Sequence, residues 1–279
     1  MTFAPEQLDR SKSDLAKLLR ELRKRAGLSG DRLARRCGLS QSTISKIETG
    51  RKTPRLTEVE SILRAVGATA ELADEVLALA RVANTEWQGV RASWRRGLEK
   101  RQFELAALES SASELRYFLP AMITGLLALP EYVRSSLAHT PGDPGRTIAR
   151  KLERQAVLCD TSKTFTFVLT EQAVRWSAIQ PVAMSVQVEH LVALSRLPNV
   201  TIGVVLNGAV TGRGPMNTFT VYDDHLATVE TFTGRIVFRD SRDIHQYLEI
   251  FAMYEAMATF GDEARLFLSE LAAEFRGDL

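Results

Sequence analysis

The segment from Leu28 to Gly50 constrains the fold more than any other part of this 279-residue sequence. It predicts two short helices joined by a tight turn. Ser29 and Ser40 are placed to cap the two helices, and Gly38 lies between them, where the backbone needs a positive φ that glycine adopts without strain. Two helices arranged in this way can place the second one in the major groove of DNA.

The second of these helices has one apolar side and one polar side. Ile44 and Ile47 are three residues apart and are predicted to face the core. The outward residues suit base edges, because glutamine pairs with adenine, lysine donates to guanine, and serine bonds to bases or phosphates. The alternative is an ordinary solvated helix face, since the same residue types are common there. The predicted base-contacting residues are Gln41, Ser42, Ser45 and Lys46.

Charge is distributed unevenly along the chain. Residues 10–55 have a net charge of +10 and the remainder has −8, although the total is only +2. A basic module on an acidic body is typical of nucleic-acid binding that is confined to one end of a chain. The residues predicted to contact DNA phosphates are Thr43, Arg51, Lys52, Arg55 and Arg23.

Three further helices complete a predicted all-α domain of five helices. The first has a leucine-rich face and is expected to begin at Ser11 or Ser13. The fourth is expected to begin with a capping box formed by Thr57 and Glu60. The fifth is predicted at residues 71–81. Five helices in about seventy residues make a domain with its own modest core.

The length of the chain requires a second domain. We predict a DNA-binding domain at residues 1–82, a connecting helix or linker at 83–102, and a second domain at 103–279. With 45% hydrophobic residues, the third segment has enough apolar material for a sizeable core. Because this acidic domain holds most of the apolar surface, it is also the expected dimerisation unit.

The spacing of apolar residues changes along the predicted second domain. Helical spacing runs from Phe103 to Phe118 and is broken at Pro120, and it returns at residues 130–137 and 146–158. The domain is predicted to be α+β, with a small antiparallel or mixed sheet. The predicted strands are 164–169, 200–205, 217–222, 226–232 and 235–239, and the later helices are 184–196, 242–260 and 263–275.

Other classes of protein receive little support from the sequence. No segment reaches the roughly 18 apolar residues of a membrane span, and the N-terminus lacks a signal-peptide core, so we expect a soluble cytoplasmic chain without membrane contact. Cys37 and Cys159 are expected to be small buried side chains rather than a disulfide. The glycines at 208, 212 and 214 lack a P-loop lysine, and the histidines lack metal-ligand spacing. We therefore expect no enzyme activity, no metal and no cofactor.

The residues from Ile44 to Pro54 resemble the Xre/Cro-type helix-turn-helix of phage and bacterial repressors, whose fold is lambda-repressor-like. The resemblance implies that the first residues of the second helix and Lys46 contact bases. It implies that Arg51 and Lys52 touch phosphates. Glu48, by the same resemblance, is a structural acid that ties this helix to neighbouring basic side chains.

The second domain also resembles a known group. The motifs Gly125-Leu126-Leu127, Pro130-Glu131-Tyr132 and Leu197-Pro198-Asn199-Val200 resemble the effector-like domain that follows the DNA-binding module in many actinobacterial regulators. Together the two resemblances cover the chain from about Ser13 to Phe275. Because members of this group often have small partner proteins, the resemblance implies such a partner here.

These features predict a transcriptional regulator that binds double-stranded DNA as a homodimer on an inverted repeat. The alternative is an antitoxin-like or anti-regulator interaction protein, whose second domain binds a small partner protein and whose DNA binding is autoregulatory. The second domain either responds to a small-molecule effector or partner protein, or only dimerises. The predicted contact residues for an effector or partner lie near the loop 207–216 and on aromatic segments: Tyr117, Phe118, Tyr132, Trp176 and Arg213.

Overall fold

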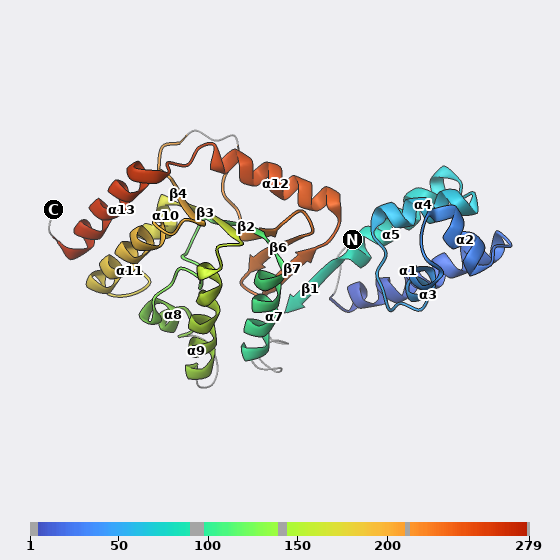
Figure 1. Cartoon of the computed structure of the whole chain (residues 1–279), viewed down its shortest axis with the longest axis horizontal. Coiled ribbons are helices and arrows are strands. Elements are labelled where there is room, and N and C mark those ends of the chain that lie inside the picture. The colour runs from blue at the N-terminus through green and yellow to red at the C-terminus, as the bar shows by residue number, and fades with distance from the viewer. Residues whose placement is uncertain (1–4, 90–97, 139–143, 210–212, 278–279) are drawn as a thin grey trace. The chain divides into compact units, whose positions relative to one another are not determined.

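The computed structural model describes residues 5–89, 98–138, 144–209 and 213–277 (Figure 1). Side chains are described throughout these ranges except at residues 5–10, 87, 89 and 98–101. The chain divides into two compact units. The first unit comprises Met1–Trp87 with Ile236–Ile244, and the second comprises Gln88–Arg235 with His245–Leu279.

Within the described residues up to 84, the first unit consists of five helices, which confirms the predicted all-α domain. Their apolar faces share one core, in which Leu19, Ile44, Val59 and Val76 are almost completely buried. The helices are α1 (Pro5–Arg25), α2 (Gly30–Cys37), α3 (Gln41–Glu48), α4 (Leu56–Val66) and α5 (Ala70–Asn84).

The turn between α2 and α3 has the caps that the sequence predicts. The Ser29 hydroxyl accepts a hydrogen bond from the Arg32 N–H at 3.2 Å, and the Ser40 hydroxyl accepts one from the Thr43 N–H at 3.1 Å. Gly38 ends α2 in the left-handed region, with φ = +68°. Ser29 therefore fixes where α2 begins, whereas Gly38 and Ser40 fix where α2 ends and where α3 begins.

Two predicted helix starts in the first unit are wrong. The helix α1 begins at Pro5 rather than at Ser11 or Ser13, because proline suits the first turn of a helix. The helix α4 begins at Leu56, which is buried in the core, so Thr57 and Glu60 form no capping box. Glu58 takes that role instead, since its carboxylate accepts a 2.8 Å hydrogen bond from the Arg55 N–H.

A seven-stranded mixed sheet with flanking helices confirms the predicted α+β class for the C-terminal region. The order of strands is β1-β7-β6-β5-β2-β3-β4, and the boundary between the units divides β1 and β7. The strands β2, β3 and β4 are parallel, whereas β5 is antiparallel to both β2 and β6. The strands are β1 (Thr85–Gly89), β2 (Glu114–Leu119), β3 (Thr164–Thr170), β4 (Val200–Val205), β5 (Phe219–Tyr222), β6 (Leu226–Thr231) and β7 (Gly234–Phe238).

Helices lie on both faces of this sheet. In Figure 1, α12 lies on one face, and α7, α8 and α9 lie on the other. Because side chains alternate along a strand, Phe118 of β2 stacks on Tyr254 of α12, whereas Tyr117 reaches Glu109 of α7. The helical segments are α7 (Leu98–Ser111), α8 (Pro130–Ser136), α9 (Gly145–Arg154), the 3-10 turn η1 (Gln155–Cys159), α10 (Glu171–Arg175), α11 (Pro181–Leu194), α12 (Ser241–Glu255) and α13 (Gly261–Arg276).

Three expectations about this region need correction. The helix predicted from Phe103 to Phe118 ends at Ser111, and its last part is strand β2, which pairs with β3 and β5 on its two sides. Residues 85–89 of the expected connecting helix or linker form β1, while residues 90–97 lie outside the described ranges. Cys159 is exposed rather than buried, and Cys37 is only partly buried; both are free thiols.

Candidate functional site

The outer face of α3 is polar and open to solvent. Ile44 and Ile47 are each only 1% exposed, and they anchor the inner side of the helix in the core. The four residues predicted to contact bases are all exposed on the other side: Gln41, Ser42, Ser45 and Lys46.

Hydroxyl groups at the start of α3 bond to one another. The Oγ atoms of Ser40 and Ser42 are 3.0 Å apart, and Ser40 Oγ is 2.8 Å from Thr43 Oγ1. Thr43 is partly buried, so its predicted contact with a phosphate would use a hydroxyl that already bonds to the helix cap. The cap therefore orders the side chains of the first turn of α3.

Arg23 and Glu48 form a bidentate ion pair between α1 and α3. Arg23 Nε is 2.6 Å from Glu48 Oε1, and Nη2 is 2.8 Å from Oε2. The third nitrogen, Nη1, donates to the Leu28 carbonyl at 2.8 Å. Hydrogen bonding to Glu48 raises the pKa of Arg23. The structural role implied for Glu48 is confirmed, and the guanidinium of Arg23, predicted to contact a phosphate, is engaged within the protein.

The loop after α3 folds back on the end of that helix. The backbone N–H groups of Arg51 and Lys52 both donate to the Lys46 carbonyl, at 2.9 and 3.1 Å. Lys52 Nζ lies 2.6 Å from Glu58 Oε1, while the side chains of Arg51 and Arg55 are exposed. Two cationic side chains of the segment between α3 and α4 are thus exposed to solvent.

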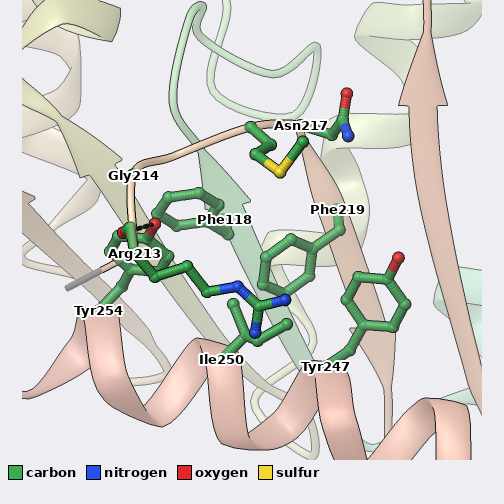
Figure 2. Close-up of a pocket in the computed structure, with 9 residues that line it drawn as sticks. Phe118, Arg213, Gly214, Asn217, Phe219, Tyr247, Ile250 and Tyr254 are labelled. Atoms are coloured by element: carbon green, nitrogen blue, oxygen red, sulfur yellow. Dashed lines mark hydrogen bonds between the residues drawn. The ribbon is translucent and has the colours of Figure 1, made fainter. Parts of the chain in front are cut away.

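Two of the predicted effector-contacting residues meet in a pocket of the second unit (Figure 2). Phe118 forms part of its wall, and Arg213 belongs to the segment that crosses it. Residues 210–212 of the predicted loop lie outside the described ranges. The cavity has a volume of about 100 Å³ and is lined by Phe118, Arg213, Gly214, Met216, Asn217, Phe219, Tyr247, Ile250 and Tyr254.

The other three predicted effector-contacting residues lie elsewhere. Tyr117 is on the opposite face of β2 from Phe118, and it is 4% exposed. Tyr132 is buried, and its hydroxyl oxygen accepts a 3.1 Å hydrogen bond from the Ile123 N–H. Trp176, at the end of α10, is 60% exposed. The aromatic residues chosen from the sequence therefore do not form one site.

A buried group of charged residues lies on the Tyr117 face of the sheet, and sequence reasoning did not predict it. Arg154 Nε is 3.0 Å from Glu109 Oε2, but the alignment is not that of a hydrogen bond. Tyr117 donates to Glu109 Oε1 at 3.3 Å, and Arg235 donates to Gln88 Oε1 at 2.5 and 3.2 Å. Among the described buried atoms, Glu109 Oε2, Arg154 Nε and Arg235 Nη1 have no hydrogen-bond partner.

Burial changes the acidity of this group. It raises the pKa of Glu109 to about 7, although Arg154, Tyr117 and Arg235 all act to lower it. Burial also raises the pKa of Tyr222 to about 12 and that of Tyr117 well above its ordinary value. No spacing in the sequence relates residues 109, 154 and 235, because three separate elements bring them together.

Two features are absent from the described residues. In this part of the chain, no helix is long and apolar enough to cross a lipid bilayer. The same residues contain no group of three or more histidine, cysteine, aspartate or glutamate side chains placed to hold a metal ion.

Comparison with known proteins defines the class of the first unit and the family of the chain. The model of a helix-turn-helix domain, a type of domain that binds DNA, matches residues 14–76. A second model, described as a domain of unknown function (DUF5753), matches residues 102–270, which is more than half of the sequence. The chain therefore belongs to the DUF5753 family and carries an N-terminal helix-turn-helix domain.

Similarities to individual proteins are weak. No protein of curated function matches the sequence. NucT from Helicobacter pylori is 10% identical, with a TM-score of 0.37, over 63% of this chain and 98% of that one. The phospholipase D family member Nuc from Salmonella typhimurium is 9% identical, with a TM-score of 0.34, over 58% and 90%. The archaeal chromatin protein TrmBL2 is 10% identical, with a TM-score of 0.33, over 72% and 61%. Scores this low carry no argument about fold or activity.

Proposed function

We propose that this protein is a sequence-specific transcriptional regulator of the Xre type, which binds an inverted-repeat operator as a homodimer. The observation that carries the proposal is the exposed polar face of α3, held in place by buried Ile44 and Ile47 on its inner side. The net charge of +10 on residues 10–55 supports it, because a basic module concentrates at the phosphate backbone.

The side chains divide into two roles in this proposal. The exposed Gln41, Ser42, Ser45 and Lys46 read base edges, since each can donate or accept in the major groove. Arg51 and Arg55 bind phosphates and set the register of the helix on the duplex. Arg23 is assigned to Glu48 rather than to DNA, because its three nitrogen atoms already donate within the protein.

The homodimer follows from the size of the reading surface. One recognition helix contacts only a few base pairs, which is too little for specificity among genomic competitors, so two copies about 34 Å apart are needed. The remainder of the chain has a net charge of −8, which opposes phosphate contact. We assign to it dimerisation and the response to an effector, as in the actinobacterial effector-like domain that it resembles, and no catalytic activity.

The test begins with selection of a preferred site from random duplexes, followed by gel-shift titration of variants. We expect Gln41→Ala and Lys46→Ala to cost about 1–3 kcal/mol on the selected site and to relax its sequence preference. Arg51→Ala should weaken selected and random DNA equally, because phosphate contacts carry no sequence information. Arg196→Ala removes the same charge from an exposed position of the second unit and serves as the control.

Two results would contradict the proposal. If Gln41→Ala, Lys46→Ala and Arg51→Ala lose affinity equally on selected and random duplexes, α3 does not read bases. If sedimentation of the full chain shows a monomer, and the complex contains one copy per selected site, the inverted-repeat arrangement is wrong.

A further inference from the structure

Aromatic rings line one side of the pocket in Figure 2. Phe118 of β2 stacks on Tyr254 of α12 with ring centroids 4.1 Å apart, and it lies 5.2 Å from Phe219 of β5. Phe219 in turn lies 5.1 Å from Tyr247, which is about two turns before Tyr254 on the same face of α12. The four rings form a continuous series in which two of the three contacts are tilted, by 35° and 50°, so one side of the pocket is aromatic.

The remaining wall comes from the segment between residues 213 and 217. The Tyr254 hydroxyl donates to the Arg213 carbonyl at 2.7 Å, which holds the backbone of this segment against α12. In Figure 2 the Arg213 side chain extends across the pocket toward Phe219 and Ile250. Met216, at the rim, is 82% exposed although its side chain is large and apolar.

Among the described residues that line the pocket, the charged side chain is that of Arg213. Burial raises the pKa of Tyr254 and the nearby charge of Arg213 lowers it, so the guanidinium interacts electrostatically with this ring of the pocket. None of the described residues that line the pocket is acidic. A cationic ligand would therefore be repelled, whereas an anionic group at Arg213 would gain a charge-assisted hydrogen bond.

Size restricts the ligand further. An apolar cavity of about 150 Å³ encloses benzene, and this cavity of about 100 Å³ is open to solvent. It holds one ring in part, with a substituent outside. A Cβ atom added at Gly214 would meet no atom within 4 Å, so open space adjoins the pocket at that point.

We propose that this pocket binds a single-ring aromatic carboxylate. The ring packs against the accessible lining residues Met216, Tyr247 and Ile250, over the buried rings of Phe118 and Phe219, and the carboxylate pairs with the guanidinium of Arg213. Small-molecule sites commonly combine apolar walls with a few polar groups that set orientation. The role of this ligand as an effector rests on the proposed regulatory function, because an effector shifts the affinity for the operator. The binding of the ligand to the pocket does not depend on that function.

The experiment measures binding of three probes to the full-length chain by ligand-detected NMR and calorimetry. The probes are benzoate, benzyl alcohol, which has the ring without the charge, and acetate, which has the charge without the ring. We expect benzoate to bind at least about tenfold more tightly than either of the others, because only it satisfies both walls and Arg213. Arg213→Gln should reduce the affinity for benzoate to that for benzyl alcohol. Arg196→Gln, at an exposed site of the same unit, should leave it unchanged.

The proposal is overturned if benzoate binds no better than benzyl alcohol, or if Arg213→Gln leaves benzoate binding intact. It is also overturned if a peptide ending in phenylalanine binds at Arg213 while benzoate does not, since the pocket then takes a protein terminus. Gel shifts with and without benzoate are a separate readout. A protein that binds benzoate in the pocket but binds no DNA refutes the proposed function and leaves the pocket assignment standing.

Discussion

Each unit of this protein contains an arginine–glutamate pair, and the two pairs are used differently. Arg23 and Glu48 are 15% and 10% exposed at their side chains, and every nitrogen of the arginine donates a hydrogen bond. Arg154 and Glu109 are 7% and 1% exposed, and facing atoms of the two side chains lack a hydrogen-bond partner. In the first pair, which lies at the edge of a core, every arginine nitrogen has a hydrogen-bond partner. The second pair lies inside a core, and facing atoms of its two side chains have none.

The difference shows how burial changes the effect of an arginine–glutamate contact on stability. Charges removed from water lose hydration that their mutual attraction repays only when geometry is good. The pKa of Glu109 is accordingly raised to about 7 by burial, despite the cation beside it. We infer that the Arg23–Glu48 pair stabilises the first unit, and that Glu109 is a strained group that the second unit tolerates.

The largest expected effect comes from removing the cation of the buried pair. Arg154→Met should destabilise the second unit by about 3–5 kcal/mol at pH 8, because it leaves the Glu109 carboxylate buried without its partner. Urea unfolding measures the change. Adding Glu109→Gln to this variant should recover part of the loss, since the unpaired carboxylate is removed while the guanidinium of Arg235 stays buried.

The control for this prediction lies one turn away on α9. Arg150 forms an exposed ion pair with Glu153, with side chains 44% and 60% exposed, so Arg150→Met should cost less than about 1 kcal/mol. If Arg150→Met and Arg154→Met destabilise the protein equally, burial does not distinguish the pairs and the comparison fails.

The second effect depends on pH. Because the folded-state pKa of Glu109 is about 7, above its ordinary value of 4.5, the folded protein holds a proton that the unfolded chain releases between these values. The stability from this group is complete below pH 4.5 and is lost as the pH rises through 7. Glu109→Gln should therefore reduce the fall in unfolding free energy between pH 5 and pH 8 by about 2 kcal/mol.

Unfolding titrations of Glu109→Gln across this pH range provide the measurement. Glu270→Gln removes an exposed carboxylate from α13 and controls for net charge. A pH profile of Glu109→Gln that parallels the parent protein would show that Glu109 does not titrate in this range.

The first unit could be predicted well because its signals are local. The caps at Ser29 and Ser40, the turn at Gly38 and the buried pair Ile44 and Ile47 each depend on residues within one or two turns of helix. Even here, the choice of Glu58 over Glu60 as the cap of α4 depends on tertiary packing, since the buried position of Leu56 fixes the first turn.

The second unit could be predicted only in part because its site depends on the sheet. The run from Leu115 to Phe118 fits a helix or a buried strand, and only the pairing of β2 with β3 and β5 decides between them. Tyr117 and Phe118 were predicted to share one candidate site, although neighbours in a strand point to opposite faces. The cluster around Glu109 and the ring of Tyr247 come from distant segments, and no local pattern marks them.

The third prediction tests the Arg23–Glu48 pair of the first unit. Glu48→Gln should lower the unfolding free energy of the first unit by about 1–2 kcal/mol, because both bonds to Arg23 lose their charge assistance. The sign is opposite to that expected for Glu109→Gln at pH 8, where removing the charge stabilises the fold. Glu21→Gln, at an exposed site of α1, should change stability by less than about 0.5 kcal/mol. If the Glu48 and Glu109 variants shift stability in the same direction at pH 8, the proposed contrast is wrong.

The smallest effect concerns the backbone rather than charge. Gly38→Ala should cost about 1 kcal/mol, because φ at this position is +68° and a Cβ disfavours the left-handed region. A Cβ there would meet no atom within 4 Å, so the cost is conformational and Gly38→Asn should cost less. Gly30→Ala is the matched control: Gly30 is not in the left-handed region, and its added Cβ would make only an ordinary 3.8 Å contact with Gln41 Nε2. Thermal unfolding of the three variants measures the difference. If Gly38→Ala is as stable as Gly30→Ala, the turn between α2 and α3 is not set by its backbone, and the local signals that made the first unit predictable do not determine it.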